Sequence, residues 1–529
     1  MKKSVLILFS VAFTLINFSI TIAQPGSLDE IFGGDGKITT SIGNYHDIAR
    51  AIAIQEDGKL VVGGYMSNYP GFDFALVRYN PDGTLDNSFD MDGKVTIDFN
   101  NSSDNAEAIV IQPDGKILIA GSSSISAFSF ALARCNTDGS LDNSFGTGGL
   151  VTTIFSIEDD DNVHGITLQD DGKILVAGEA NFNGPNHTGD FAIARYNQDG
   201  SLDNSFGTGG KIITDFFGYS DRADGIAVQA DGKIIVAGTS GDGNSNGFDF
   251  AMVRYNSDGS FDNSFGNGGK VITDYYGNYE GARSIVIQPD GKIILGGSAY
   301  TAYGMDFALA RYTSDGNLDT SFDDDGKVTS SFLNQYPDWG HSVVLQEDGK
   351  IILTGSFGST GDVDKFGMVR YNTDGSHDIE FGFLGFTVAD FGGSDEMAYS
   401  AAIQSDKKIV LAGHSDVGTS NFVFAVARFL SGLETGIINF SETGNQMLVY
   451  PNPIYESTTL KYSLQKEEII SIDLYDMKGS IVQSFISNQH KPEGNNKEIL
   501  NFSNSIPAGY YNLVISNGKG RQSIRIIKR

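Results

Sequence analysis

The sequence predicts an all-β protein: a seven-bladed β-propeller, closed by its N-terminal strand, followed by a small immunoglobulin-like β-sandwich. Three observations predict this fold. Three short motifs each recur seven times, every repeat contains four short strand patterns, and the last repeat lacks a strand that the N-terminus supplies. The 529 residues include 66 glycines and only 19% charged residues, a composition typical of many tight turns. The expected parts are a signal peptide (1–23), the propeller (24–430), a linker (431–446) and the sandwich (447–529).

The repeat is defined by motifs that return with a mean period of about 58 residues. The first, Gln-x-Asp-Gly-Lys, has its Gly at 58, 115, 172, 232, 291 and 349, and Lys407 takes the Gly place in a degenerate seventh copy. The second, Phe-Ala-x-x-Arg-Tyr-Asn, has its Arg at 78, 134, 195, 254, 311, 370 and 428. The third, Gly-Ser-Leu-Asp-x-x-Phe-Gly with some substitutions, has its Asp at 29, 86, 142, 203, 262, 319 and 378.

Each unit is expected to form four short antiparallel strands. The Asp-Gly of the first motif predicts a hairpin, because a type I′ turn needs positive φ at both central residues. No window of helical period interrupts the strand patterns. Seven such units fit a seven-bladed propeller. The alternative is a β-solenoid, whose coils are usually much shorter and whose ends need capping units.

The ends of the array favour a closed ring. The chain begins with the third motif and one strand pattern, and the array finishes with the other three strands at 397–430. We therefore expect residues 36–41 to pair beside residues 422–429, which removes two strand edges that would otherwise promote aggregation. Seven phenylalanines of the third motif are expected to be buried between strands: Phe32, Phe89, Phe145, Phe206, Phe265, Phe322 and Phe381.

The repeat resembles a known family. The copy at 307–322 reads Phe-Ala-Leu-Ala-Arg-Tyr-Thr-Ser-Asp-Gly-Asn-Leu-Asp-Thr-Ser-Phe, and it resembles the delta-60 repeat family. The resemblance covers about 26–430, and it departs from the family pattern at Asp323, which replaces the last Gly. It implies a β-propeller of unassigned function and supplies no catalytic residues.

From Met447 the repeat is lost, and short alternating strands predict a small β-sandwich. Its motifs are Tyr-Pro-Asn-Pro at 450–453, Leu-Tyr-Asp-Met-Lys-Gly at 474–479, Ile-Pro-Ala-Gly-Tyr-Tyr at 506–511 and a basic end at 526–529. In this order they resemble a type IX secretion system C-terminal sorting domain, type A. The resemblance implies recognition by an outer-membrane translocon, removal of the tail, and release or attachment at the cell surface. The alternative is an ordinary adhesive module. The sorting residues that the resemblance implies are Pro451, Asn452, Pro453, Gly479, Gly509, Tyr510, Lys528 and Arg529.

The N-terminus and the composition predict the compartment. Two lysines precede an apolar run over 5–22 that ends before Gln24, a pattern typical of a secretory signal peptide. Polar residues dilute the run, which favours cleavage over the alternative of a membrane anchor. The net charge of −30 argues against nucleic acid and anionic membranes as partners. The single cysteine, Cys135, excludes an intramolecular disulfide framework. We expect a secreted or cell-surface monomer with no membrane span in the mature chain.

Comparison of the seven copies places the length variation on one face. The turn between third and fourth strands has the same length in every copy, and so have the Asp-Gly hairpins on the same face. On the other face, the separation from a second-strand Gly to the next motif Phe varies from 9 to 13 residues. A rigid scaffold with one variable face is typical of binding surfaces. The seven second-strand glycines stand at 64, 121, 178, 238, 297, 355 and 413.

Two rings of residues are expected at the channel mouth on the variable face, because first strands should line the channel. The first is a fixed acidic ring, which we interpret as structural, pairing with strand cations or capping turns. Its members are Asp47, Asp104, Asp161, Asp221, Glu280, Asp338 and Glu396. The second is a variable ring three residues later, which is the candidate binding site: Arg50, Glu107, His164, Asp224, Arg283, His341 and Tyr399.

Three motifs that suggest other chemistry do not fit. Asn-x-Asp-Gly-x-x-Asp at 80–86 is similar to part of a calcium loop, but Arg78 stands where the first carboxylate belongs, so an Arg–Asp pair with an Asx-turn explains it better. The Gly-rich segment 265–270 lacks the Ser or Thr of a P-loop and leads into a strand. We find no Ser/His/Asp order and no Gly-x-Ser-x-Gly elbow. We therefore predict no enzyme activity, no cofactor and no metal ligands.

The sequence thus predicts a non-catalytic binding or interaction scaffold at or outside the cell surface. Its expected partners are the type IX outer-membrane translocon, through the C-terminal domain, and a surface glycan or protein, through the propeller. The alternative is an extracellular propeller hydrolase or lyase acting on polysaccharide or protein. A carboxylate pair in the channel at the separation that glycosidases use would favour that alternative.

Overall fold

The computed structural model of the chain describes residues 24–433 and 447–529. Short gaps lie at 69–70, 125–126, 156–158, 183–188, 242, 244–246, 303, 333–335, 360–362, 417–420, 451, 453, 465, 476–480, 504 and 518–519. The predicted signal peptide and most of the predicted linker lie outside the described residues. No helix among the described residues is long and apolar enough to cross a membrane.

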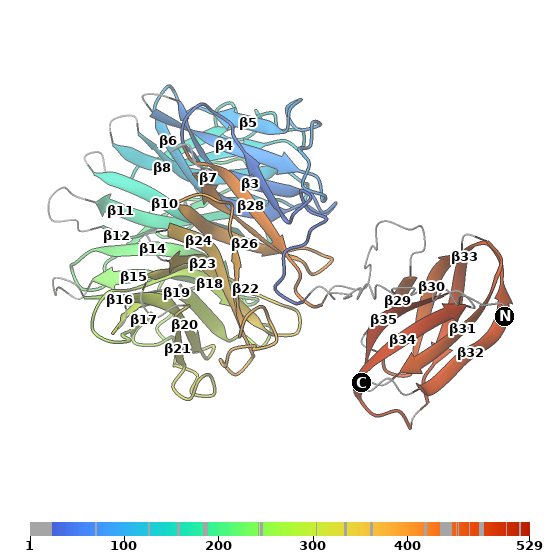
Figure 1. The fold of residues 1–529 in the computed structure, drawn as a ribbon. Coiled ribbons are helices and arrows are strands. Elements are labelled where there is room, and N and C mark those ends of the chain that lie inside the picture. The colour runs from blue at the N-terminus through green and yellow to red at the C-terminus, as the bar shows by residue number, and fades with distance from the viewer. Residues whose placement is uncertain are drawn as a thin grey trace, which may run out of the picture.

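Residues 37–429 form seven four-stranded antiparallel sheets arranged around an axis (Figure 1). Blade 1 consists of β2 (Asp47–Ile54), β3 (Leu60–Asn68), β4 (Gly71–Tyr79) and β5 (Lys94–Ile97). Blade 2 consists of β6 (Ser103–Ile111), β7 (Ile117–Ser124), β8 (Phe128–Cys135) and β9 (Leu150–Thr153). Blade 3 consists of β10 (Asp160–Leu168), β11 (Ile174–Phe182), β12 (Asp190–Tyr196) and β13 (Lys211–Thr214). Blade 4 consists of β14 (Asp221–Val228), β15 (Ile234–Gly241), β16 (Phe248–Tyr255) and β17 (Lys270–Thr273).

The last three blades follow the same order until the chain end is reached. Blade 5 consists of β18 (Glu280–Ile287), β19 (Ile293–Thr301), β20 (Gly304–Tyr312) and β21 (Lys327–Ser330). Blade 6 consists of β22 (Asp338–Leu345), β23 (Ile351–Ser359), β24 (Val363–Tyr371) and β25 (Phe386–Ala389). Blade 7 consists of β26 (Glu396–Ile403), β27 (Ile409–Ser415), β28 (Val423–Phe429) and the N-terminal β1 (Lys37–Thr40).

The N-terminal strand closes the ring, as the sequence predicts. β1 pairs antiparallel with β28, in a register that runs from Lys37 opposite Ala427 to Thr40 opposite Phe424. The first strand of every blade contacts the first strand of the next, and β26 contacts β2, so the seven innermost strands enclose the axis. A closed ring of seven excludes the solenoid alternative.

Apolar side chains fill the spaces between neighbouring blades. In one such cluster, Ile234 and Val236 of blade 4 pack against Leu175 and Ala177 of blade 3. Large residues facing small ones let two twisted sheets approach closely. Cys135 is fully buried in another cluster, and burial raises the pKa of its thiol to about 12. The cysteine is therefore a packing residue, as expected.

The three repeat motifs meet in one buried cluster, which we call the latch. In blade 4, Nε of Arg254 donates to Oδ2 of Asp262 at 2.8 Å, and the guanidinium lies 4.3 Å from the ring centre of Phe265. The Lys233 ammonium lies 3.0 Å from the same Oδ2. Nη1 of Arg254 donates to the main-chain carbonyl of Ser314 in blade 5 at 2.5 Å. The latch thereby ties each blade to the next.

The latch recurs in every blade and also closes the ring. In blade 7, Asp29 and Phe32 come from the N-terminal segment, and Arg428 reaches the main-chain carbonyl of Pro81 in blade 1. The seven phenylalanines predicted to be buried are fully buried. The seven arginines are Arg78, Arg134, Arg195, Arg254, Arg311, Arg370 and Arg428.

The C-terminal strands form two sheets around a separate core (Figure 1). One sheet contains β29 (Met447–Tyr450), β30 (Ser457–Leu464) and β33 (Gly494–Asn501). The other has the order β32 (Ile481–Lys491), β31 (Glu468–Tyr475), β34 (Gly509–Asn517) and β35 (Gly520–Lys528). Leu460 of the first sheet and Ile472, Leu513 and Ile526 of the second are fully buried in this core. The domain is a small β-sandwich, as predicted.

Deleting residues 24–41 should prevent ring closure, because it removes both β1 and the carboxylate and phenyl ring of the seventh latch. We expect aggregation, or an unfolding midpoint far below that of the intact chain. Trp339, the only tryptophan, lies in β22, so its fluorescence in urea reports on the propeller alone. An unchanged midpoint and unchanged solubility would refute closure by this segment.

Replacing one latch arginine should be strongly destabilising. The variant Arg254→Met leaves Asp262 buried without its main partner, and removing one partner of a buried ion pair costs about 3–5 kcal/mol. Urea unfolding followed by Trp339 fluorescence measures this loss. The control is Glu347→Ala, which breaks an exposed ion pair with Lys407 and should cost at most about 1 kcal/mol. Equal effects of the two substitutions would contradict the role given to the latch.

Candidate binding site at the channel mouth

Every first strand contains a β-bulge, and the bulged residue is the variable-ring residue in all seven blades. In blade 1, Ala49 pairs with Gly64 and Ala51 with Gly63, so Arg50 has no partner in the ladder. A bulge re-aims a side chain and frees it from the alternation of the strand. The ladders of the other blades skip Glu107, His164, Asp224, Arg283, His341 and Tyr399 in the same way. We call these seven residues the bulge ring.

A glycine of the second strand makes each bulge possible. A Cβ atom on Gly64 would lie 2.0 Å from the carbonyl oxygen of Ile48, and one on Gly238 would lie 1.9 Å from that of Arg222. The same obstruction exists at Gly121, Gly178, Gly297, Gly355 and Gly413. These are the seven second-strand glycines of the repeat. Only glycine lets the bulged backbone approach this closely.

Four members of the bulge ring form one continuous arc across blades 6, 7, 1 and 2. The rings of His341 and Tyr399 lie 5.0 Å apart, and the guanidinium of Arg50 lies 4.1 Å from the centre of the Tyr399 ring. Nε of Arg50 lies 3.5 Å from Oε2 of Glu107. Tyr65, which no sequence argument selected, accepts a hydrogen bond from Arg50 at 3.2 Å. The arc therefore combines a cation, a carboxylate and aromatic rings.

The other three members lie in blades 3, 4 and 5. Arg283 donates to Oδ1 of Asp224 at 3.1 Å, and Arg222 reaches both oxygens of the same carboxylate. His164 Nε2 lies 3.8 Å from Oε1 of Glu179, a residue of β11. Arg222 and Glu179 were missed by the sequence reasoning, because they belong to positions that the repeat pattern does not mark.

The histidine of the first arc is neutral at ordinary pH. Burial lowers the pKa of His341 to about 3, and the nearby cation Arg50 acts in the same direction. Its Nε2 atom is out of contact with solvent and has no hydrogen-bond partner among the described residues. A neutral imidazole can donate or accept one further hydrogen bond.

The acidic ring caps the loops between blades. All seven side chains are buried, and each accepts at least one main-chain N–H from the loop that precedes its strand. Phe216 donates to Asp221 at 2.7 Å, Phe332 donates to Asp338 at 2.8 Å, and Gly393 donates to Glu396 at 2.7 Å. This geometry is turn capping, one of the two structural roles that the sequence predicts for this ring, and the buried acids are not exposed at the channel mouth.

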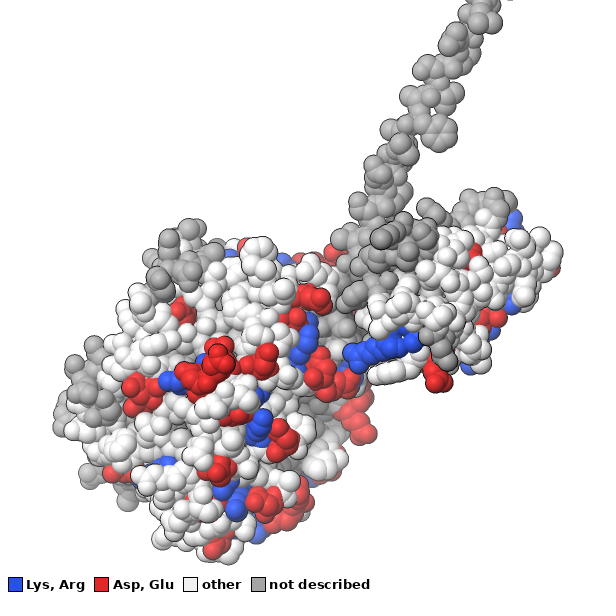
Figure 2. Space-filling model, turned by 90° about the horizontal axis from the view of Figure 1, so that it is seen from below, with Lys and Arg blue, Asp and Glu red and all other residues white. Residues whose placement is uncertain are grey.

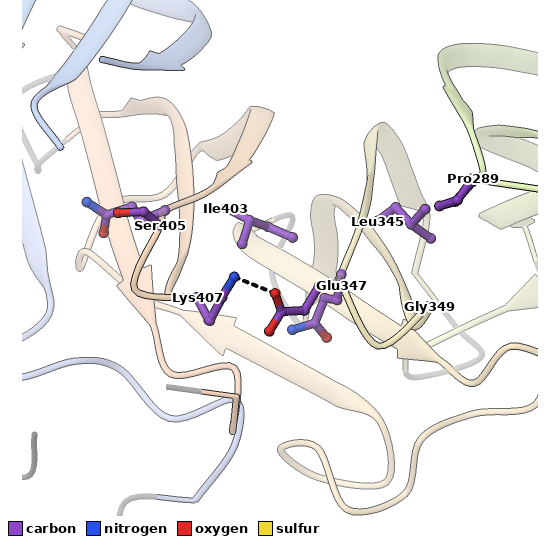
Figure 3. A pocket seen from close by; sticks show the side chains of 9 residues that line it. Pro289, Leu345, Glu347, Gly349, Ile403, Ser405 and Lys407 are labelled. Carbon is purple, nitrogen blue, oxygen red and sulfur yellow. Dashed lines mark hydrogen bonds and ion pairs between the residues drawn. The ribbon is translucent and has the colours of Figure 1, made fainter. Parts of the chain in front are cut away.

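A pocket lies at the opposite ends of the first strands, on the hairpin face (Figure 3). It has a volume of about 460 Å³ and is lined by the hairpins of blades 5, 6 and 7, including Pro289, Leu345 and Ile403. Lys407 points across it and pairs with Glu347. Lys407 has φ of 75° in the position that six other blades give to glycine. In the sequence, the pocket is marked only by Lys407 in the place of a glycine, a change that by itself indicates no more than a degenerate copy of the first motif.

The structure brings most of the sorting residues to one end of the sandwich. Oδ1 of Asn452 accepts the main-chain N–H of Ile527 at 2.8 Å, which fixes the start of the domain against its last strand. Gly509 pairs with Lys528, and Tyr510 with Ile527. Arg529 donates its main-chain N–H to Ile454. The remaining sorting residues, Pro451, Pro453 and Gly479, lie outside the described residues.

Two family matches agree with this architecture. Residues 55–89, 112–145, 169–206, 229–265, 288–322 and 346–381 match a β-propeller domain of unknown function, DUF5122, and residues 448–529 match a secretion system C-terminal sorting domain. The chain therefore carries DUF5122 β-propeller repeats and a type IX sorting domain, and it is exported to the cell surface or beyond. The matched ranges leave out blade 7, whose strands come from both ends of the array.

Several solved structures are similar to the chain at low identity and low TM-score. The polysaccharide lyase Uly1 is 13% identical, with 74% of this chain and 91% of that chain covered and a TM-score of 0.42. A protein of unknown function from Dyadobacter fermentans is 14% identical, with 74% and 98% covered and a TM-score of 0.40. PorZ, a surface component of the type IX secretion system of Porphyromonas gingivalis, is 11% identical, with 91% and 81% covered and a TM-score of 0.26. No curated protein matches the chain.

Asp338 should make the propeller less stable as the pH rises. Burial raises its pKa to about 7, so the folded chain keeps a proton that the unfolded chain loses near pH 4. This stabilising contribution is complete below about pH 4 and is lost as the pH rises through 7. We expect the loss of unfolding free energy between pH 5 and 8 to be on the order of 1–3 kcal/mol smaller in Asp338→Asn. Urea unfolding followed by circular dichroism measures it.

The matched control is Asp324→Asn, which changes an exposed carboxylate. This variant should keep the pH dependence of the unaltered chain. If Asp338→Asn also keeps it, Asp338 is ionised throughout this range and the prediction is wrong.

Proposed function

We propose that the protein is an exported, non-catalytic scaffold that binds a glycan or a protein through the bulge ring. The observation that supports this proposal most directly is the contrast between backbone and side chain. All seven bulges share one geometry, yet their side chains include two arginines, two histidines, a glutamate, an aspartate and a tyrosine. A position that varies on a fixed backbone is typical of recognition rather than of scaffold stability.

The charges of the ring suit a polar ligand of mixed character. Arg50, Glu107 and Arg283 each retain about a quarter of their side-chain exposure, so they remain accessible although they are paired. The Tyr399 ring beside Arg50 offers a face of the kind on which sugar rings and planar side chains pack. On the surface seen in Figure 2, acidic side chains lie interspersed with fewer basic ones. Together with the net charge of −30, this surface disfavours polyanions as ligands.

A hydrolase or lyase is the second candidate, and one observation favours it. In the first arc, the Tyr399 ring contacts both the neutral His341 and Arg50, and these residue types serve as base, acid and charge stabiliser in many enzymes. Against it, Nε2 of His341 has no hydrogen-bond partner among the described residues, so no described nucleophile is bonded to it for activation.

Binding should be tested with the purified full chain against a panel of extracellular polysaccharides and outer-membrane proteins. Each binder is then measured again with Arg50→Ala, His164→Ala and Arg283→Ala. We expect at least a tenfold loss of affinity in one or more of these variants, since each removes a charged or hydrogen-bonding group from the mouth. The control is Lys407→Gly, which restores the repeat consensus on the opposite face and should leave affinity unchanged.

Three outcomes separate the candidates. Loss of affinity in the ring variants alone supports the scaffold. Depolymerisation of a polysaccharide that stops in the same variants supports the enzyme. Binding that is lost in Lys407→Gly but kept in the ring variants would move the site to the hairpin-face pocket and overturn the proposal.

A further inference from the structure

A second set of carboxylates lies at the junctions between blades, outside the bulge ring. It is defined by strand register. In blade 4, Phe250 of β16 pairs with Thr273 of β17, so Asp249 precedes one partner and Asp274 follows the other. Glu280, the acidic-ring residue of blade 5, joins them. One carboxylate oxygen from each of the three residues lies within 4.8 Å of the other two.

The buried member of this triad has an unused ligand atom. Oε1 of Glu280 accepts the main-chain N–H groups of Tyr276 and Asn278. Its Oε2 is out of contact with solvent and has no hydrogen-bond partner among the described residues. Burial raises the pKa of Glu280 to about 7, and the negative charges of Asp249 and Asp274 act in the same direction. A buried acceptor beside two further carboxylates lacks a positive partner.

No described lysine or arginine supplies that partner to Glu280 or Asp274. Lys327 approaches the junction, but its ammonium donates to the main-chain carbonyl of Asp274 at 3.1 Å rather than to the carboxylate. Asp274 itself is exposed, so an ion from solvent can reach the triad.

The triad occurs at three of the seven junctions. Register places Asp73 and Asp98 beside Asp104 between blades 1 and 2. It places Asp190 and Asp215 beside Asp221 between blades 3 and 4. Three acids at equivalent positions of three blades are not required by the sheet, since the other junctions form the same ladder without them.

At the junction between blades 6 and 7, a lysine replaces one of the three carboxylates and pairs with the other two. Phe366 pairs with Ala389 there, so Lys365 takes the place of Asp249 and Asp390 the place of Asp274. The Lys365 ammonium lies 2.7 Å from Oδ1 of Asp390, 3.4 Å from Oε1 of Glu396 and 2.9 Å from the main-chain carbonyl of Gly393. A cation of the chain thus occupies the position between the two remaining acids.

Two further junctions compensate in another way. Ser41 takes the middle position between blades 7 and 1, and its hydroxyl lies 3.4 Å from Oδ2 of Asp47. Ser331 takes that position between blades 5 and 6 and bonds to Asp338. In these two junctions a hydroxyl donor stands in the place of the middle acid, whereas Ile154 takes that place between blades 2 and 3.

We propose that each triad binds one Ca²⁺ ion, and that the ion at Asp249, Asp274 and Glu280 ties blade 4 to blade 5. Oxygen-only ligands select a hard divalent cation, and Ca–O bonds of about 2.3–2.6 Å let one ion bridge oxygens up to about 5 Å apart. Mg²⁺ needs shorter bonds and near-ideal octahedral geometry, which a triad from three separate segments does not enforce. The sequence pattern alone predicts no metal ligands, because the three carboxylates converge only through strand register.

The ion would connect β16, the segment after β17 and the start of β18. These segments lie at the end of the blades that carries the variable loops and the bulge ring. An ion bound to the triad would cross-link blades 4 and 5, as the Lys365 ammonium cross-links blades 6 and 7. It binds the folded chain and not the unfolded one, so it raises stability with Ca²⁺ concentration.

The test is Ca²⁺ titration of the metal-stripped full chain by calorimetry, together with thermal melting with and without Ca²⁺. We expect about three sites and a melting temperature that rises by several degrees on addition of Ca²⁺. Asp274→Asn changes an exposed side chain, so the variant should fold, and it should lose one site. Lys365→Asp completes the triad at the blade 6–7 junction and should gain one.

The matched control is Asp306→Asn, at the position equivalent to Asp249 in a junction without a triad. It should keep the full number of sites. The proposal is overturned if the unaltered chain binds no Ca²⁺, if Asp274→Asn and Asp306→Asn bind the same number of ions, or if Mg²⁺ binds more tightly than Ca²⁺. Glu280→Gln provides a second variant of the same site, and its melting temperature should no longer respond fully to Ca²⁺.

Discussion

The propeller depends on a buried arginine that every blade extends toward the next. Each latch joins a carboxylate, a lysine and a phenyl ring of its own blade to a main-chain carbonyl of the neighbour. Hydrogen bonds from Ser264, with help from Lys233 and Arg254, lower the pKa of Asp262 despite its burial, so the carboxylate stays charged and holds the arginine. Apolar contacts between blades are non-directional, whereas this pair adds directional hydrogen bonds between them.

The latch also explains why the three repeat motifs occur together. Their residues are distant within each repeat, yet the Lys, Arg, Asp and Phe converge on one point. The exchange of Asp29 and Phe32 from the N-terminal segment into blade 7 satisfies the same requirement. Closure is therefore a matter of side-chain chemistry as well as of strand pairing, since the seventh arginine would otherwise be buried without a carboxylate.

Much of the fold could be predicted from the sequence because every repeat contains the same pattern of turns, strands and latch residues. Six Asp-Gly hairpins with a degenerate seventh copy, and an Arg that recurs seven times, identify the strands, and the displaced third motif identifies β1 as the closing strand. The candidate site was predicted less completely. Variation at Arg50 and its equivalents marks positions, but only the structure shows that these are bulges and that Arg50 contacts Tyr399.

Other contacts had no counterpart in a sequence pattern. The pairing of Glu179 with His164 depends on the twist of neighbouring strands, and the convergence of Asp249, Asp274 and Glu280 depends on a register between three segments. At the hairpin pocket, Lys407 keeps the positive φ that glycine adopts in the other six hairpins, so this departure adds a side chain to the pocket lining without changing the turn.

The bulges determine which residues of the inner strands can be substituted without disturbing the ladder. Because the bulged residue takes no part in the ladder, its side chain can be exchanged without breaking a hydrogen bond between strands. The glycine opposite, such as Gly64, preserves the backbone path whatever side chain is present. Each blade thus offers one position at which the side chain can change while the frame stays intact.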